Sequence, residues 1–208
     1  NRPLPFGLSV PDPLDPTEFI SVNVPGMDAL HMGIETDISY VIAKRLTLEG
    51  MVSVGDWRWA SAEDIEIYDD TISFDARGVH VGDAAQSAYA LSLRYGFGKG
   101  GYIKMKYTYF DRYFSNFDPN SLTGATAGTD SWKIPGYGLM SVHAGYRFRF
   151  ENSSLNLRAN IFNALNTMYI SDARNNYHLD GTKDFDANSA VVFIGQGFRF
   201  NISLGFQF

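Results

Sequence analysis

Seven stretches of this 208-residue chain alternate apolar with polar residues at a period of two. Their apolar positions extend over the ranges 32–42, 46–54, 89–97, 103–109, 142–150, 155–161 and 200–208. Successive side chains of a β-strand point to opposite faces of its sheet, so this period predicts strands. No comparably long stretch has the period of a helix. The chain is therefore predicted to be all-β.

The connections between these stretches alternate in length. Short links at "AKR", "GKGG" and "ENSS" alternate with long loops, over about 58–85, about 111–136 and before the last stretch. Neighbouring antiparallel strands joined in this way bring all short turns to one end of the sheet and all long loops to the other. We expect an antiparallel up-and-down meander with two unlike ends.

The length of the alternating stretches indicates whether their apolar face contacts membrane lipid or the core of a soluble protein. A tilted strand needs about 9 to 11 residues to cross a bilayer, and most of these stretches reach that length, whereas soluble strands usually have about 5 to 6. The opposite face is polar and carries charges at Glu35, Glu49, Arg94, Lys104, Lys106, Arg147, Arg149, Arg158 and Arg199. These features favour part of a transmembrane β-barrel with a polar lumen.

Aromatic residues gather toward the ends of the alternating stretches. They are Tyr40, Trp57, Trp59, Phe97, Tyr102, Tyr109, Phe148, Phe150, Phe206 and Phe208. Aromatic girdles of membrane barrels lie at the lipid headgroups, so these residues are predicted to form such girdles.

Composition excludes several classes of protein. A net charge of −6 argues against a nucleic-acid partner, which needs a basic surface. The absence of cysteine excludes disulfides, thiol catalysis and cysteine-bound metal. No apolar run approaches the roughly 20 residues of a membrane helix.

The last ten residues, "RFNISLGFQF", resemble the C-terminal insertion signal of bacterial outer-membrane barrels. The matching positions are Phe200, Ile202, Leu204, Phe206 and Phe208. The resemblance implies that the barrel assembly machinery of the outer membrane reads this strand before the strand enters the wall.

The last 180 or so residues resemble the C-terminal part of a TonB-dependent receptor barrel of the Bacteroidetes type. The matching stretches include "HMGIETDISY", "LEGMVSVGDWRW", "YTYFDRYFSNFDP", "IPGYGLMSVHAGYRF" and "NIFNALNTMYISDA". Members have a 22-stranded barrel, an N-terminal plug in its lumen and a segment that binds TonB. The resemblance implies that this chain is about seven strands of a larger outer-membrane barrel, whose parent takes up a scarce ligand such as a metal chelate or a glycan.

Residues 1–29 differ from the rest of the chain in composition, because they are rich in proline. Five prolines stand there, at Pro3, Pro5, Pro11, Pro13 and Pro16. Proline cannot donate to a central strand, so we expect an irregular extracellular loop segment at 1–29, followed by barrel strands and loops at 30–208. The long loops are expected on the extracellular side.

Candidate sites are sparse. His31, His80, His143 and His178 lack metal-ligand spacing, and Ser141 beside His143 lacks an obvious carboxylate for a triad, so no catalytic, cofactor or metal site is predicted. The acidic loop with Glu63, Asp64, Glu66, Asp69, Asp70, Asp75 and Asp83 is expected to be solvated rather than to bind calcium. Ligand contacts are expected at Trp59, Tyr68, Asp69, Asp70, Trp132 and Tyr177.

Two other architectures satisfy the same alternation. A complete small outer-membrane barrel, acting as a channel or adhesin, would use Thr17–Val24 as an eighth strand. A soluble β-sandwich, for example a carbohydrate-binding module, would bury the apolar face under a second sheet.

Overall fold

The computed structural model describes residues 6–12, 14–24, 28–67, 70–117, 122, 127–175 and 186–208. Seven long strands form the path of the main sheet, each antiparallel to its neighbours. They are β3 (Ala29–Ala43), β4 (Leu46–Trp59), β7 (Ala85–Phe97), β8 (Gly101–Phe114), β11 (Tyr137–Arg149), β12 (Ser154–Phe162) and β15 (Arg199–Gln207). The seven strands predicted from the alternating stretches are thus confirmed.

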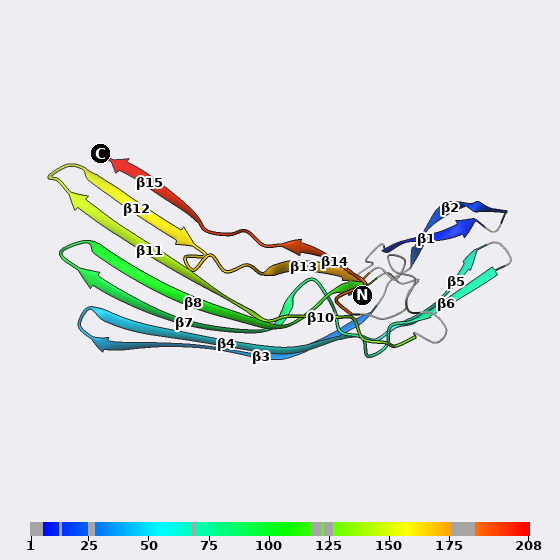
Figure 1. The fold of residues 1–208 in the computed structure, drawn as a ribbon. Helices are drawn as coiled ribbons and strands as arrows, with labels where there is room; N and C mark the ends of the chain where they lie inside the picture. The colour runs from blue at the N-terminus through cyan, green and yellow to red at the C-terminus, as the bar shows by residue number, and fades with distance from the viewer. Residues whose placement is uncertain are drawn as a thin grey trace.

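The two ends of the sheet differ as expected. Figure 1 shows the three short turns, β3–β4, β7–β8 and β11–β12, at the same end as the C-terminus. The long connections extend from the other end and contain β5 (Ala62–Ile67), β6 (Asp70–Asp75), β9 (Asn116–Phe117), β10 (Lys133–Ile134), β13 (Ile170–Asn175) and β14 (Ala190–Ile194). No helix in the described part of the chain is long and apolar enough to cross a membrane.

The proline-rich start is not irregular throughout, and that prediction was wrong. β1 (Phe6–Asp12) and β2 (Asp15–Val24) form an antiparallel hairpin, with Pro11 opposite Phe19 and a register shift just after Pro11. A two-stranded ribbon leaves one edge of each strand unpaired, so a strand can hold a proline without losing a ladder hydrogen bond.

The main sheet is open. β3 and β15 lie at its two edges, and β2 pairs with β1 rather than with either edge. The small closed barrel with Thr17–Val24 as its eighth strand is therefore not formed by the described residues.

The apolar face of the main sheet has no protein cover. Ile34, Leu91 and Ile202, on β3, β7 and β15, are 75%, 58% and 67% exposed. The two inner faces of a soluble sandwich would bury such residues under a second sheet. Among the described residues, buried hydrophobic packing is concentrated instead at the long-loop end of the sheet, where Tyr113 of β8 packs with Ile134 of β10.

Three of the predicted girdle aromatics lie on the polar face. Trp57 and Trp59 share the parity of Ser53, and Tyr102 shares that of Lys104. Their contacts agree, because the ring of Trp57 stacks on His31 with centroids 5.3 Å apart, and the Arg94 guanidinium lies 4.8 Å above the ring of Tyr102. The girdle prediction is therefore wrong for these three residues.

Candidate functional site

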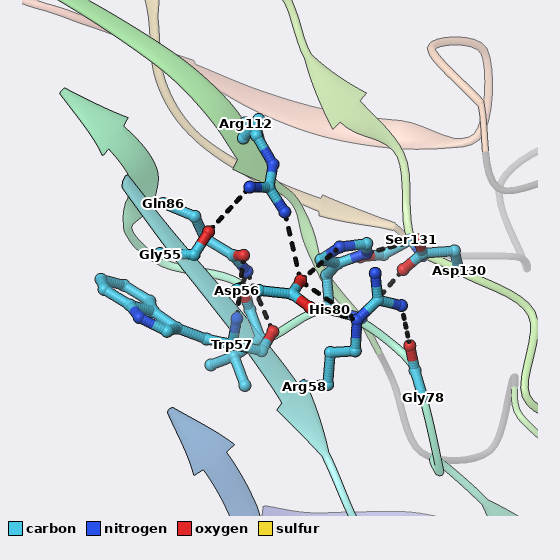
Figure 2. A network of polar contacts seen from close by, with 11 residues as sticks. Gly55, Asp56, Trp57, Arg58, Gly78, His80, Gln86, Arg112, Asp130 and Ser131 are labelled. Atoms are coloured by element: carbon cyan, nitrogen blue, oxygen red, sulfur yellow. Dashed lines mark hydrogen bonds and ion pairs between the residues drawn. The ribbon is translucent and has the colours of Figure 1, made fainter. Parts of the chain in front are cut away.

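A network of charged side chains occupies the long-loop end of β4 (Figure 2). Residues 78–81 run antiparallel beside this end, and Val81 N donates to Trp57 O (2.9 Å) while Trp59 N donates to Val79 O (2.9 Å). This extra pairing brings His80 beside Arg58. We call Asp56, Arg58, His80, Arg112 and Asp130 the loop network.

Asp56 is the centre of the loop network. Its carboxylate accepts from Arg58 Nε (3.1 Å to each oxygen) and from Arg112 Nη2 (3.1 Å), and its Oδ1 lies 3.4 Å from His80 Nε2. The two guanidiniums also donate to backbone carbonyls, Arg58 to Gly78 O and Arg112 to Gly55 O, each at 2.8 Å. Asp56 thus joins β4 to β8 and to the segment that contains Gly78 and His80.

His80 connects this centre to a second long loop. The imidazole is buried, with 7% exposure, and its Nδ1 lies 2.5 Å from Asp130 Oδ2, while its backbone N donates to Asp130 Oδ1 (2.9 Å). Its ring stacks on Phe114 with centroids 3.9 Å apart. His80 and Asp130 are 50 positions apart, so no sequence spacing revealed this pair.

The loop network links β4 and β8 to residues 78–80 and to Asp130. Each of its carboxylates is hydrogen-bonded, and the described residues contain no group of three His, Cys, Asp or Glu side chains that could hold a metal ion. Gln86 reinforces the same region, because its amide bonds both Trp57 N and Trp57 O at 3.0 Å.

The acidic loop contains local pairs in its described part. Arg77 donates to Asp75 from Nη2 (2.6 Å), Nε (2.9 Å) and its backbone N (2.9 Å), and these bonds hold the pKa of Asp75 down at about 2. At Asp83, partial desolvation by neighbouring groups and the nearby Asp172 carboxylate raise the pKa of the carboxyl. That the acidic loop is solvated rather than a calcium site stays a prediction.

The polar face of the main sheet carries a row of hydrogen bonds. Glu49 accepts from Ser92 Oγ (2.8 Å) and pairs with Lys104, and Ser53 Oγ donates to Glu35 (3.1 Å). These partners come from β3, β4, β7 and β8 and lie side by side in register.

Ser141 and His143 are within hydrogen-bonding distance of each other. His143 Nε2 lies 3.1 Å from Ser141 Oγ, and Nδ1 lies 2.8 Å from Asn160 Oδ1, while Asn160 Nδ2 donates to Asn201 Oδ1 (2.7 Å). An acyl-transfer site also needs free donors for an oxyanion. Here β11 is paired on both sides, so its backbone donors are used by the sheet. The four residues form a hydrogen-bonded chain across the sheet.

The residues predicted to contact ligand do not form one described site. Trp59 is buried, with 5% exposure, and Trp132 packs against the cluster of Tyr113, Ile134 and Ala173. Asp70 begins β6. Tyr68, Asp69 and Tyr177, like His178, lie outside the described residues. A ligand-binding role for these positions stays a prediction.

The stretch "NIFNALNTMY" forms a joint between the main sheet and the β13–β14 hairpin. Asn163 is buried, with 5% exposure and a φ of 47°. Its Nδ2 donates to Thr167 O (2.8 Å) and Gln196 O (3.2 Å), and its Oδ1 accepts from Thr167 N (2.8 Å). Asn166, with a φ of 52°, accepts from Phe198 N (2.9 Å). The two asparagines therefore tie the segments just before β13 and just after β14 to the end of β12.

Two comparisons with known proteins agree with this architecture. A family model described as TonB dependent receptor-like, β-barrel, matches residues 6–164. The chain is also similar to the crystal structure of the siderophore receptor PiuA from Acinetobacter baumannii, with a TM-score of 0.55 and 14% identity over 97% of this chain and 24% of that one. At this identity the likeness shows the fold, and this chain spans about a quarter of that receptor. No curated protein matches. The Bacteroidetes type stays a prediction.

Proposed function

Because this chain belongs to the TonB-dependent receptor-like β-barrel family, we propose that it forms the C-terminal wall of an outer-membrane receptor that takes up a scarce ligand. The family is one of receptors and transporters, not of enzymes, and its barrels lie in the outer membrane. The ligand class proposed here is a metal chelate or a glycan. The energy for uptake would come through TonB, which binds the N-terminal part of the parent protein.

The exposed apolar face of the main sheet carries this proposal. Large hydrophobic side chains line that face on all seven strands, including Ile38, Val52, Met105 and Leu204. Exposed apolar patches beyond a few hundred square ångströms are rare on soluble monomers. A lipid bilayer would cover this face, while the charged face turns to the lumen.

The open edges of the sheet support a larger barrel. Backbone groups at the edge of a sheet have no partner in lipid, so a membrane sheet closes on itself. β3 and β15 would therefore pair with strands of the parent that this chain does not contain. The terminal strand, with Phe200, Ile202, Leu204, Phe206 and Phe208, would also be the signal for the barrel assembly machinery.

The orientation follows from the two unlike ends of the sheet. Bacterial barrels have short periplasmic turns and longer extracellular loops. The β3–β4, β7–β8 and β11–β12 turns would thus face the periplasm, and the hairpins β1–β2, β5–β6 and β13–β14 would lie outside the cell.

The size of the native protein tests this proposal. Purified outer membranes are blotted with an antibody against residues 87–208. A band several times heavier than 23.2 kDa is expected, because these residues would be the end of a large receptor. A band near 23.2 kDa that shifts on boiling would contradict the proposal and indicate a small independent barrel.

A further inference from the structure

Two neighbouring short turns, β3–β4 and β7–β8, carry exposed cations at the same end of the main sheet (Figure 1). Lys44 and Arg45 form the β3–β4 turn, and Lys99 lies in the β7–β8 turn. The two turns lie side by side, because Gly96 N, near the end of β7, donates to Arg45 O (2.8 Å). We call Lys44, Arg45 and Lys99 the rim cations.

The rim cations have no acidic partner in the described part of the chain. None of the ion pairs found there includes any of the three. Glu151, in the β11–β12 turn, is the one acidic residue of the three short turns. The chain as a whole is acidic, at −6, so this concentration of positive charge is local.

A row of aromatic rings lies on the apolar face beside these turns. Tyr95 and Phe97 of β7 are stacked with centroids 6.5 Å apart, and Phe97 lies 6.1 Å from the ring of Tyr146 on β11. The ring of Tyr146 in turn lies 4.6 Å from that of Phe148. We call these four residues the aromatic row. The Tyr146 hydroxyl reaches the β7–β8 turn, because it lies 3.3 Å from the place where a Cβ on Gly98 would stand.

The rim cations and the aromatic row together have the chemistry of a phospholipid contact. Amphipathic aromatic rings lie at the headgroup level of membrane proteins, so cations just beyond such a row lie at the level of the phosphates. The Arg45 guanidinium can donate two parallel hydrogen bonds to a phosphate, and the ammonium groups of Lys44 and Lys99 add point charges. A soluble anion would use the cations alone, whereas a lipid also uses the rings, because its chains are apolar.

From these observations we infer that the rim cations and the aromatic row form a binding site for the headgroup of an anionic phospholipid. This inference rests on the proposed function, because it places the apolar face in the membrane and the short turns at the periplasmic leaflet. Arg45 and Lys99 donate to the phosphate, and the acyl chains lie against the aromatic row. A zwitterionic lipid carries an ammonium group that the rim cations repel, so the site selects lipids with a net negative charge.

The first test measures lipid selectivity in the purified full-length receptor. The receptor is equilibrated in micelles with equal amounts of phosphatidylglycerol and phosphatidylethanolamine, and the retained lipids are counted by native mass spectrometry. We expect the wild type to retain phosphatidylglycerol preferentially. Each cation near an anionic lipid surface is worth about fivefold, so Arg45→Gln with Lys99→Gln should lower the retained ratio at least about tenfold. Both side chains are exposed, so this double variant should fold.

Lys106→Gln with Arg158→Gln is the matched control, because it also removes one lysine and one arginine, but from the polar face. Its retained ratio should equal that of the wild type. The absence of any preference in the wild type, an unchanged ratio in the rim variant, or the same loss in the control would overturn the inference.

The second test locates the bound lipid. Phosphatidylglycerol with a photoreactive group in its headgroup is irradiated with the same receptor, and the crosslinked peptides are identified. They should contain the β3–β4 or the β7–β8 turn, and their yield should fall in about 1 M salt, where exposed charges are screened beyond about 3 Å. Crosslinks only at the long-loop end would overturn the inference. Loss of the crosslink on addition of inorganic phosphate at constant ionic strength would also overturn it, since it would indicate a site for soluble anions.

These readouts do not depend on uptake, so the inference and the proposed function can fail separately. If ligand import fails but phosphatidylglycerol is selected and crosslinked as expected, uptake is wrong and the lipid site stands. If import is normal but both lipids are retained without preference, the inference about the rim cations is wrong. Retention of no lipid at all would contradict both the lipid site and the membrane wall.

Discussion

Asn163 provides a direct test of how the β13–β14 hairpin is held. Its buried side chain makes three hydrogen bonds, two to Thr167 and one to Gln196, and its backbone has a φ of 47°. Each such bond contributes about 0.5–1.5 kcal/mol net, so Asn163→Gly should weaken the joint by about 2–4 kcal/mol. Asn163→Ala loses the same bonds and adds about 1–2 kcal/mol relative to the glycine variant, because alanine has a Cβ but lacks the local side-chain hydrogen bonds that let asparagine adopt the left-handed region.

The assay is hydrogen exchange followed by mass spectrometry on the full-length receptor in detergent or lipid. The amides of Thr167 and Phe198 report directly, because the first donates to Asn163 Oδ1 and the second to Asn166 Oδ1. Since about 1.4 kcal/mol corresponds to a factor of ten, exchange at Thr167 should rise roughly 30-fold to several hundred-fold in Asn163→Gly, and further in Asn163→Ala.

Asn156→Ala is the matched control. Asn156 lies on the same strand, β12, but its side chain is not part of the joint. Wild-type exchange at Thr167 in Asn163→Gly would refute the contribution of the three side-chain bonds. Equal exchange in the glycine and alanine variants would refute the argument from backbone strain.

Four further outcomes follow from the structure. His80→Leu removes the link between Asp56 and Asp130, so trypsin should cleave after Lys133 faster than in wild type, and an unchanged rate would show that the loop network does not hold this loop. Ile38→Arg places a charge on the apolar face and should destabilise the assembled barrel by about 2–4 kcal/mol, measured by urea unfolding. Ser39→Arg, on the polar face, should destabilise it far less, and equal losses of stability would contradict the assignment of the two faces. Phe208→Ser should lower the amount of receptor in the outer membrane relative to Gln207→Ser, and normal assembly would argue against the insertion signal. The Arg77 bonds lower the pKa of Asp75 in the folded hairpin to about 2 from about 3.8, so their contribution is present above pH 3.8 and disappears as the pH falls toward 2. Because both side chains are partly exposed, that contribution is about 1 kcal/mol at most. The rate of proteolysis of the β5–β6 hairpin should therefore rise as the pH falls from 3.8 toward 2 in the wild type, and this rise should be absent in Asp75→Asn.

The sequence by itself determined the strands of the wall and their order. A period of two is a local property of backbone geometry, so the alternation from Met32 to Ile42 or from Leu155 to Ile161 predicts strands without knowledge of any partner. The alternating lengths of the links then determined the antiparallel meander. The same parity also placed Trp57 and Tyr102 on the polar face. Their position near the ends of strands was therefore not sufficient to predict that they belong to a lipid-facing girdle.

Only the tertiary structure decided which distant residues meet. The pairing of His80 with Asp130 depends on how residues 78–81 and a second long loop lie beside β4, and no periodicity connects positions 50 apart. The β1–β2 hairpin likewise arose where prolines predicted a loop, because an isolated ribbon has unpaired edges that a central strand lacks. Alternation along a strand is a local property of the residues in that strand, whereas contacts between loops depend on the arrangement of the whole sheet. For this physical reason the strands of the wall could be predicted from the sequence and the loop network could not.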